Sequence, residues 1–514
     1  MSAVDVRDLL TAAGAAKTAA GEEARPAPIG PAASPAATAP EQRRSPLSPV
    51  VLSGVVRALD FVLIIALAMG ARQIAAHEVN LLDLVCATLI SGLAIGLFQA
   101  GGAYQMAAFK NLAASAVKVL VGWSLTVLAV AGVMALTRLA DHGWPIWLAS
   151  LYVFGLGALL SDRAGLHAFV RAKARQGAFD RRIAIVGGGG AAEDLIHALE
   201  ASNDGSIKII GVFDDRNVDR SSDGVATDRV ARPPKLGNVS DLVSYARRST
   251  VDLIVFTVPI SAETRILQML AKLWVLPIDI RLSAHSAKLR LRPRAYSYVG
   301  AVPVLDVYDK PLSDWAVIAK GAFDGIIALA ALVCLAPVML IVALAVKLGS
   351  RGPVLFKQKR YGFNNELIEV FKFRSMYVDQ GDAAAAKLVS KDDPRVTPIG
   401  RFIRKTSLDE LPQLFNVLRG DLSLVGPRPH ALQAKAANTL YDQVVDGYFA
   451  RHKVKPGITG WAQINGWRGE TDTTEKIERR VEYDLYYIEN WSILFDLKIL
   501  ARTPFALLNT QNAY

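Results

Sequence analysis

Four apolar runs in the first third of the chain limit its fold more than any other feature. They cover residues 53–73, 81–101, 119–138 and 144–162. Each is close to the about 20 residues that a helix needs to cross a bilayer. Charged residues make up 20% of the chain, which is below the roughly 25% that is usual for soluble domains. We therefore expect a membrane protein with a four-helix transmembrane bundle over residues 48–165.

Basic residues next to these runs predict their orientation. The first run is preceded or opened by Arg43, Arg44 and Arg57, and the fourth is followed by Arg163, Arg171, Lys173, Arg175, Arg181 and Arg182. Because segments rich in Lys and Arg stay in the cytoplasm, we expect the N-terminus and everything after residue 163 on the cytoplasmic side. Arg57 lies three residues before Asp60, so these two side chains are expected to pair at the membrane edge.

The N-terminal tail and the overall charge narrow the choice of partners. Residues 1–47 are rich in Ala and Pro and lack the apolar segment of a signal peptide, which predicts a disordered cytosolic tail. The formal net charge is +11. Since many basic residues lie beside apolar segments, we expect membrane lipid and phosphate as partners, and no nucleic acid. The two cysteines, Cys86 and Cys334, lie in apolar runs and exclude a disulfide framework or a cysteine metal site.

A different pattern covers residues 178–306. Short buried strands such as "RRIAIV" and "LIVF" alternate with helical stretches, which predicts a Rossmann-like α/β domain with a parallel sheet. Gly187, Gly189 and Ala192 match the G-x-G-x-x-A fingerprint, and Asp214 ends the next strand. Two interpretations stay open. These residues hold a nucleotide pyrophosphate at the helix N-terminus, or the glycines only let helix and strand pack closely.

Residues 323–346 form a fifth apolar run, which Pro337 interrupts. A proline removes a backbone donor and favours a bend in a helix. Basic residues lie on both sides of the run, so a simple crossing would place one basic cluster outside the cell, against the charge rule. We expect a re-entrant helix that bends at Pro337 and returns to the cytoplasmic side. A kinked helix that crosses the membrane is the alternative.

The segment after this run collects basic side chains. Two strands around the turn "GFNN" carry five of them: Lys357, Lys359, Arg360, Lys372 and Arg374. Farther along, Arg404 precedes a pair of carboxylates, Arg428 stands between two prolines, and Lys455 opens the stretch "KPGITGWAQINGW". Guanidinium groups can hold phosphate oxygens with two hydrogen bonds at once. The candidate phosphate or substrate ligands are Arg360, Lys372, Arg374, Arg404, Arg428 and Lys455.

Asp409 and Glu410 stand side by side in "SLDELPQLF". Pro412 indicates that a helix begins here, with Ser407 or Asp409 as its N-cap, which places both carboxylates at a helix N-terminus. They either cap that helix, or bind Mg²⁺ and attack phosphorus. The nearby arginines and the apolar anchor favour the second interpretation. The end of the chain mixes charged with aromatic residues, which predicts amphipathic helices on the membrane surface.

Four ordered motifs lie within residues 315–514: "KQKRYG", "KFRSM", "SLDELPQLFNVLRGDLSLVGPRP" and "KPGITGWAQINGW". Together they resemble the bacterial sugar transferases, which are polyprenyl-phosphate phosphoglycosyl transferases with a monotopic catalytic core. The preceding spans and α/β domain are similar to the long members of that family. "GWRGETDT", "YYIENWS" and the final "NAY" resemble undecaprenyl-phosphate glucose phosphotransferases of exopolysaccharide synthesis. One departure is Ala336-Pro337, where the family often has Ser-Pro, so no serine hydroxyl supports the bend.

The resemblance implies a reaction at the bacterial inner membrane. Glucose 1-phosphate would pass from a UDP-sugar to undecaprenyl phosphate, with release of UMP. Asp409 would attack the sugar-bearing phosphorus and form a covalent aspartyl-phosphosugar, and Glu410 would assist through metal positioning or acceptor activation. Mg²⁺, held by both carboxylates, would offset negative charge. The implied partners are undecaprenyl phosphate, the UDP-sugar, inner-membrane lipid and a second copy of the chain in a homodimer.

Other functions remain to be distinguished. Within the family, galactose 1-phosphate is the alternative group transferred, because no residue pattern identifies the side chain that reads the sugar. A different class is a membrane-anchored, NAD-dependent nucleotide-sugar dehydratase, but such enzymes use a Tyr-x-x-x-Lys pair, and Tyr245 and Tyr308 lack the lysine. In a third interpretation the α/β domain is a regulatory or dimerising module.

Overall fold

The computed structural model describes residues 48–508, apart from residues 77–79, 138–143, 203–205, 217–232, 260–261, 285–296, 301, 379–392, 431–434, 437–438, 441–447 and 468–472. The chain divides into two compact units, one comprising residues 44–181 and the other containing residues 182–514. The predicted disordered tail and the final "NAY" lie outside the described residues.

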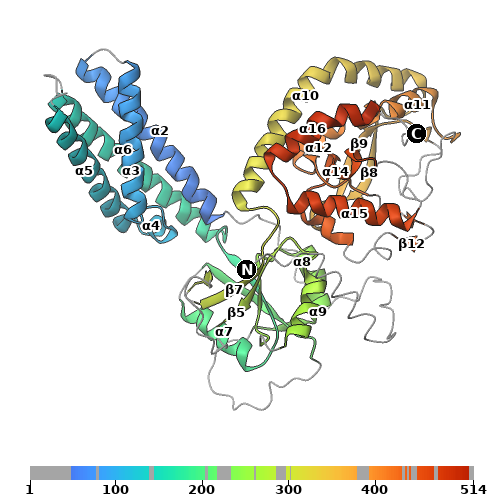
Figure 1. Cartoon of the computed structure of the whole chain (residues 1–514), viewed down its shortest axis with the longest axis horizontal. Helices are drawn as coiled ribbons and strands as arrows, with labels where there is room; N and C mark the ends of the chain where they lie inside the picture. The colour runs from blue at the N-terminus through green and yellow to red at the C-terminus, as the bar shows by residue number, and fades with distance from the viewer. Residues whose placement is uncertain are drawn as a thin grey trace. The chain divides into compact units, whose positions relative to one another are not determined.

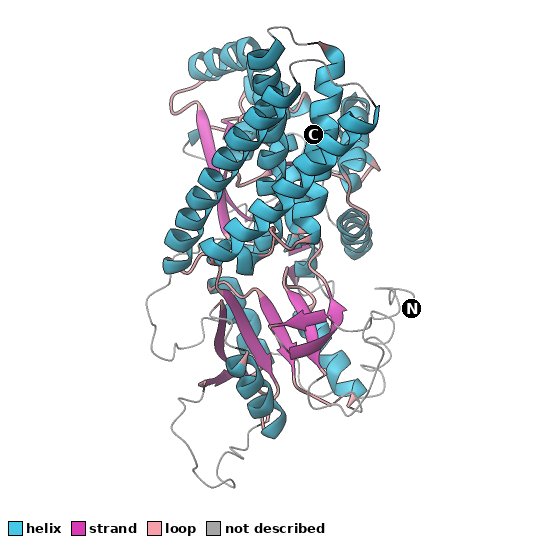
Figure 2. Cartoon of the chain, turned by 90° about the vertical axis from the view of Figure 1, so that its left-hand side faces the viewer, coloured by secondary structure: helices cyan, strands magenta, loops and turns pink. Residues whose placement is uncertain are grey.

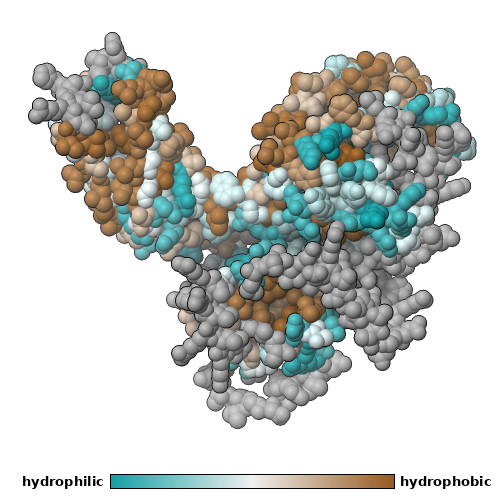
Figure 3. All heavy atoms as spheres, viewed as in Figure 1, coloured by the Kyte–Doolittle hydropathy of each residue, from teal (hydrophilic) through white to brown (hydrophobic). Residues whose placement is uncertain are grey.

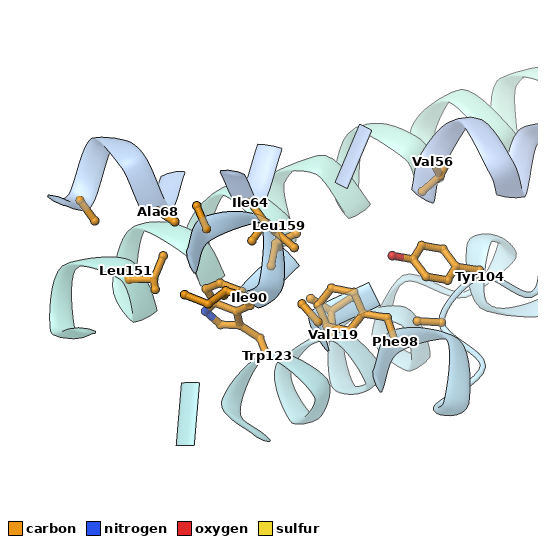
Figure 4. Packing of buried hydrophobic residues seen from close by; sticks show 14 of the residues in the cluster. Val56, Ile64, Ala68, Ile90, Phe98, Tyr104, Val119, Trp123, Leu151 and Leu159 are labelled. Atoms are coloured by element: carbon orange, nitrogen blue, oxygen red, sulfur yellow. The ribbon is translucent and has the colours of Figure 1, made fainter. Parts of the chain in front are cut away.

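The unit of residues 44–181 is built from helices, seen in blue to teal in Figure 1: α2 (Pro49–Ala76), α3 (Leu81–Ala100), α4 (Met106–Lys110), α5 (Leu112–Thr137) and α6 (Trp144–Arg175). Its four long helices carry the four apolar runs and are long and apolar enough to cross a membrane. α2 and α5 each pack against α3 and α6. Their buried side chains, among them Ile64, Trp123 and Leu159, meet in one cluster (Figure 4).

A buried ion pair joins two helices of this unit. Asp60 on α2 pairs with Arg163 on α6 and accepts a hydrogen bond from the Tyr104 hydroxyl at 2.8 Å. The expected partner of Asp60 was Arg57, which instead donates to the Ser53 hydroxyl and lies over the Tyr104 ring. Because Asp60 and Arg163 are 103 residues apart in the sequence, no local pattern could have predicted this pair.

The second unit begins with an α/β domain, whose sheet is drawn in magenta in the lower part of Figure 2. Its elements are β1 (Arg181–Val186), α7 (Gly190–Ala201), β2 (Ile207–Phe213), β3 (Lys235–Gly237), α8 (Val239–Arg248), β4 (Leu253–Phe256), α9 (Glu263–Leu273), β5 (Asp279–Ser283), β6 (Ser297–Val299) and β7 (Val302–Tyr308). The strand order is β3-β2-β1-β4-β5-β7-β6. Its first five positions follow the order that dinucleotide-binding sheets use.

The sheet is mixed, which corrects the expected parallel sheet. β1 pairs with β4, β4 with β5 and β2 with β3 in parallel. β7 pairs antiparallel with both β5 and β6. The difference arises because β6 and β7 follow each other as a hairpin, and a hairpin reverses the chain without a crossover helix.

The glycine-rich turn after β1 is closed by the chain itself. The Gly188 N–H donates to the Asp214 carboxylate at 3.0 Å, and Asp214 pairs with Arg265 on α9 at 3.2 Å. Gly187 and Gly189 have φ values of +104° and +88°, which glycine adopts without strain. Asp214, which only one of the two interpretations places at a nucleotide, therefore accepts a hydrogen bond from the turn. These contacts favour the packing interpretation of the fingerprint over the nucleotide site.

The C-terminal domain follows. Its elements are α10 (Asp314–Gly349), β8 (Leu355–Tyr361), η3 (Phe363–Asn365), β9 (Leu367–Phe373), α11 (Pro398–Lys405), η5 (Leu408–Glu410), α12 (Gln413–Arg419), β10 (Ser423–Val425), β11 (Lys435–Ala436), β12 (Thr439–Leu440), η6 (Tyr448–Lys453), β13 (Gly457–Thr459), α14 (Trp461–Ile464), α15 (Thr474–Glu489) and α16 (Ile493–Leu508). β8 and β9 form the expected antiparallel hairpin around residues 362–366.

α10 is the fifth helix that is long and apolar enough to cross a membrane. It is a single 36-residue helix that contains Pro337, and Figure 1 shows it as a curved ribbon. Its exposed side chains include Ile326, Val333, Leu340 and Leu348, and Figure 3 shows hydrophobic atoms along its outer side. The helix thus continues through the proline, and the expected bend takes the form of a curve.

Close backbone contacts and one buried amide assemble the loops of the C-terminal domain. β10 runs parallel to β13, and a Cβ on Gly457 would lie only 2.1 Å from the Gly426 nitrogen. The glycines of "LVGPRP" and "KPGITG" therefore let two backbones touch. Asn416, a residue of α12, is fully buried. Its side-chain amide accepts from the Phe371 N–H at 2.9 Å and donates to the Glu369 carbonyl at 2.7 Å. This side chain attaches α12 to β9.

Candidate active site

The two carboxylates of the sequence motif lie in the short turn η5, between α11 and α12. Ser407 precedes them with a φ of +58°, a left-handed conformation that is uncommon for residues other than glycine and recurs at functional sites. Ser407, one of the two expected N-caps, is the N-cap residue of η5, but its side chain makes no capping hydrogen bond. Asp409 is not an N-cap, because α12 begins at Gln413 with Pro412 as its N-cap. The left-handed residue starts a separate turn, so Asp409 and Glu410 precede the helix.

Glu410 is held by two cations. Lys372 on β9 contacts Oε1 at 2.8 Å, while Arg428 contacts Oε1 at 2.6 Å and Oε2 at 3.3 Å. Burial by itself raises the pKa of Glu410, but the charges and hydrogen bonds of Arg428 and Lys372 together outweigh it and hold the pKa well below its ordinary value. Glu410 is therefore ionised, with both oxygens engaged.

Asp409 lies beside this cluster with an open carboxylate. Its side chain makes no hydrogen bond or ion pair with the residues that the structure describes, although Asp409 is only 7% exposed. Burial is the main cause that raises the pKa of Asp409; the charge of Lys372 lowers it and that of Glu410 raises it again. Two adjacent carboxylates whose pKa values shift in opposite directions are typical of a catalytic pair with divided roles.

Arg404, in the last turn of α11, is the open cation of the site. Burial lowers its pKa and is the largest cause, while the nearby charges of Asp409 and Asp393 raise it. Within the described ranges of the chain, its guanidinium group has no hydrogen bond or ion pair. A partly buried guanidinium beside an unpaired carboxylate is available to an incoming phosphate.

Two other predicted phosphate ligands donate hydrogen bonds to groups of the protein itself. Arg360 donates from Nη1 to the Pro429 carbonyl at 2.6 Å and from Nε and Nη2 to Gln358. Arg374 caps the C-terminal end of α10, because it donates to the carbonyls of Val346, Ser350 and Arg351. We therefore assign Arg360 to the support of the turn at residues 428–430 and Arg374 to the support of α10.

Lys455 is a further predicted ligand that the structure does not bring to the carboxylates. Its side chain is exposed near Gly420 at the end of α12, and among the described residues it makes no hydrogen bond or ion pair with Asp409 or Glu410. Sequence reasoning missed Asn416 and Gln358, which hold β9 and Arg360 in place. The only local signal was a polar residue inside the apolar stretch "LFNVL" and another in a strand.

The donor groups allow one mode of magnesium binding. No group of three or more His, Cys, Asp or Glu side chains able to hold a metal is found in the described part of the chain. Proteins often bind Mg²⁺ through one or two carboxylates and substrate phosphates. Asp409 fits as the single protein ligand in such a site. Glu410 is the second expected ligand, but both of its carboxylate oxygens already accept hydrogen bonds from Arg428 or Lys372. A bound magnesium ion would neutralise charge on a diphosphate.

Comparison with known proteins gives two family matches. The bacterial sugar transferase family matches residues 315–510, which contain the carboxylate pair. A CoA-binding domain family matches residues 99–284, which span α4 to α6 and much of the α/β domain.

Three relatives extend the likeness over most of the chain. A UDP-glucose:undecaprenyl-phosphate glucose-1-phosphate transferase of Escherichia coli is 38% identical over 76% of this chain and 81% of its own length. A protein of the same description from Xanthomonas campestris is 36% identical over 72% of this chain and 75% of its own. An undecaprenyl-phosphate glucose phosphotransferase of Komagataeibacter xylinus is 41% identical over 65% of this chain and 60% of its own.

Proposed function

Because this chain belongs to the bacterial sugar transferase family, we propose that it transfers glucose 1-phosphate from UDP-glucose to undecaprenyl phosphate and releases UMP. The relatives, which are described as glucose-1-phosphate transferases or as a glucose phosphotransferase, support glucose as the sugar. The observation that carries the mechanism is the contrast within the pair: Glu410 is locked by two cations, while Asp409 remains open beside Arg404.

The reaction proceeds in two displacements. A carboxylate oxygen of Asp409 forms a bond to the sugar-bearing phosphorus of UDP-glucose. The bond from that phosphorus to the bridging oxygen breaks, and UMP leaves with the electron pair. Arg404 binds oxygens of the phosphate under attack, where its charge stabilises the transition state. An oxygen of undecaprenyl phosphate then attacks the same phosphorus, which frees Asp409 and yields undecaprenyl-diphosphate-glucose.

The locked glutamate prepares the site for this chemistry. Its negative charge lies next to Asp409 and, with burial, raises the pKa of Asp409, which makes the ionised carboxylate a better nucleophile than one in water. Arg428 and Lys372 offset the charge of Glu410, so the turn does not repel a diphosphate. A magnesium ion bound by Asp409 and the donor phosphates would add positive charge.

A soluble donor and a lipid acceptor can meet only at a membrane surface. We propose that α10 enters the inner membrane and returns, so that the α/β domain and the active site face the cytoplasm. Pro337, the curve of α10 and the basic residues on both sides of it support this topology. In a background without Cys86 and Cys334, cysteines at residues 309 and 347 should both react from the cytoplasmic side. Labelling of either one from outside contradicts the return.

The function is tested by UMP release from a set of UDP-sugars with purified enzyme and undecaprenyl phosphate. We expect UDP-glucose to react fastest; faster release from UDP-galactose or an N-acetylated donor would overturn the choice of sugar only.

The covalent step has its own test. Incubation with sugar-labelled UDP-glucose and no acceptor should place label on the peptide that contains Asp409. Asp409→Asn should lose this label and about 10⁴-fold or more in turnover, whereas Glu369→Gln, on the same hairpin as Lys372, should keep both. Full turnover in a folded Asp409→Asn protein would end the covalent mechanism.

A further inference from the structure

Residues 428–430 form a turn whose three carbonyls each accept a hydrogen bond from a residue distant in the sequence. Arg451 Nη2 donates to the Arg428 carbonyl at 2.9 Å, Arg360 Nη1 donates to the Pro429 carbonyl at 2.6 Å, and the Tyr361 N–H donates to the His430 carbonyl at 3.3 Å. The donors come from η6 and β8. The turn is thus fixed from two sides along its whole length.

Arg451 is a buried residue whose guanidinium group is held by contacts with other residues of the C-terminal domain. It is 2% exposed, and its Nη1 donates to the Tyr448 hydroxyl at 2.7 Å. Its charge is paired with Asp484 on α15 at 2.6 Å, and Asp484 is equally buried. Burying a charged pair gives little net stability compared with apolar residues of similar size. The pair instead fixes geometry: it holds the Arg451 guanidinium in one orientation, in which Nη2 donates to the Arg428 carbonyl.

The backbone of Arg428 controls where its side chain lies. Pro427 and Pro429 flank it and restrict the backbone on both sides. With its carbonyl fixed by Arg451, the remaining freedom of Arg428 is in its side chain, which contacts Glu410 at 2.6 and 3.3 Å. Loss of the bond from Arg451 would let the turn rotate and shift the guanidinium from Glu410. A misplacement of about 1 Å in an active site can lower a rate about 100-fold.

We propose that Arg451, oriented by Asp484, is a positioning residue for the transfer reaction: it fixes the 428–430 turn so that Arg428 holds Glu410 beside Asp409. Among the described contacts, Arg451 touches neither carboxylate of the pair. Its effect on the reaction passes through Arg428. This inference rests on the proposed function for its kinetic readout, but not for its structural one.

The kinetic test uses Arg451→Lys, which keeps the charge and can keep the pair with Asp484 but cannot donate to Tyr448 and to the turn in the same geometry. We expect kcat for UMP release to fall about 10- to 100-fold, with KM for UDP-glucose within about threefold and a thermal midpoint near that of the wild type. The matched control is Arg479→Lys on α15, an exposed residue paired with Glu482, which should keep the wild-type kcat. An unchanged kcat in Arg451→Lys overturns the proposal.

A double-mutant cycle separates positioning from general stability. If Arg451 acts through Arg428, then Arg451→Lys combined with Arg428→Lys should lose little more activity than Arg428→Lys alone. Multiplicative losses would show that the two residues act independently and would overturn the proposal. Should Arg451→Lys fold poorly, Tyr448→Phe removes one support of Arg451 and should produce a smaller fall in kcat of the same kind.

Hydrogen exchange gives a readout that does not depend on the reaction. The Tyr361 amide donates to the His430 carbonyl, so loosening of the turn should speed exchange at Tyr361 in Arg451→Lys. The Ile254 amide in the α/β sheet should stay as protected as in the wild type. Equal protection of Tyr361 in both proteins overturns the proposal. If the wild type released no UMP from any donor while Tyr361 still lost protection in the variant, the proposed function would fail, and the fixing of the 428–430 turn by Arg451 would stand.

Discussion

The C-terminal domain contains two buried clusters of charge that differ in one respect. In the first, Lys372, Arg404 and Arg428 surround Asp409 and Glu410. In the second, which we call the α10 network, Lys320 and Asp324 on α10 meet Asp496 on α16. Both clusters join segments far apart in the sequence. They differ in whether the charges are satisfied by the protein.

Every carboxylate oxygen of the α10 network has a donor. Lys320 contacts Asp496 at 2.7 Å and Asp324 at 3.6 Å. Asp324 also accepts from the Ser423 hydroxyl at 2.7 Å and from the Leu424 N–H at 3.3 Å. Asp496 accepts from the Tyr487 hydroxyl at 2.7 Å and from the Trp491 ring N–H at 3.0 Å. Satisfied buried networks rigidify a domain. This network therefore fixes α10 and α16 to β10, the strand that leads into the Arg428 turn.

The active-site cluster leaves one carboxylate and one guanidinium open. Asp409 and Arg404 are partly or fully buried but lack partners among the described residues. Buried groups without partners are unfavourable, so they persist where a ligand completes them. The comparison teaches that buried charge alone does not identify a reactive site; the unsatisfied members of the cluster do.

The largest difference between the clusters should appear in stability. Asp496→Asn removes the main partner of buried Lys320 and should cost about 3–5 kcal/mol, because an uncompensated buried charge remains. Asp409→Asn should cost almost nothing, since no bond is lost. Thermal unfolding of both variants in detergent measures this. Asp421→Asn, with a partly exposed carboxylate paired with Arg419 at 3.5 Å, is the control for the substitution itself. Similar losses in the first two variants would remove the distinction between the clusters.

The open guanidinium provides the next test. Arg404→Gln should lower kcat/KM for UDP-glucose about 10- to 100-fold, or roughly 1.4–2.7 kcal/mol, if Arg404 binds the phosphate under attack. Arg401→Gln, on the same helix but exposed, should leave kcat/KM within about twofold. Equal activity in Arg404→Gln and Arg401→Gln would mean that Arg404 has no contact with the substrate, and the unsatisfied-charge criterion would then apply to Asp409 alone.

The sequence predicted the residue types of the site better than their contacts. The motifs located Asp409, Glu410, Lys372 and Arg428, which the structure brings together. The positive charge of Arg374 suggested phosphate, yet its donors cap α10. Which basic residue faces an anion depends on carbonyls that only the folded backbone provides.

Pairs between residues far apart in the chain could not be predicted from the sequence, because they too depend on the folded backbone. Lys320 and Asp496 are 176 residues apart, and neither lies in a local pattern that indicates the other. The four apolar runs, by contrast, were located closely, because each is a local property of about 20 residues. The antiparallel edge of the α/β sheet was missed because strand alternation predicts neighbours, not the direction of a terminal hairpin.

The smallest expected effect concerns the pH dependence of stability. The pKa of Asp409 is raised in the folded protein above its ordinary value of 3.8 by burial. A raised pKa contributes stability that is fully present below pH 3.8 and is lost as the pH rises through the folded value. Glu410 has the opposite sign: its pKa is lowered below 4.5, so its contribution is present above pH 4.5 and is lost in acid.

Asp409→Asn should therefore raise the thermal midpoint slightly at pH 7 and lose this advantage toward pH 4. Glu410→Gln should lower the midpoint at pH 7, and its deficit should shrink in strong acid. Midpoints measured from pH 8 into strong acid below pH 4 test the signs for both variants. Parallel curves for Asp409→Asn and the wild type would mean that ionised Asp409 is not strained in the fold, and that the two carboxylates differ only in their neighbours.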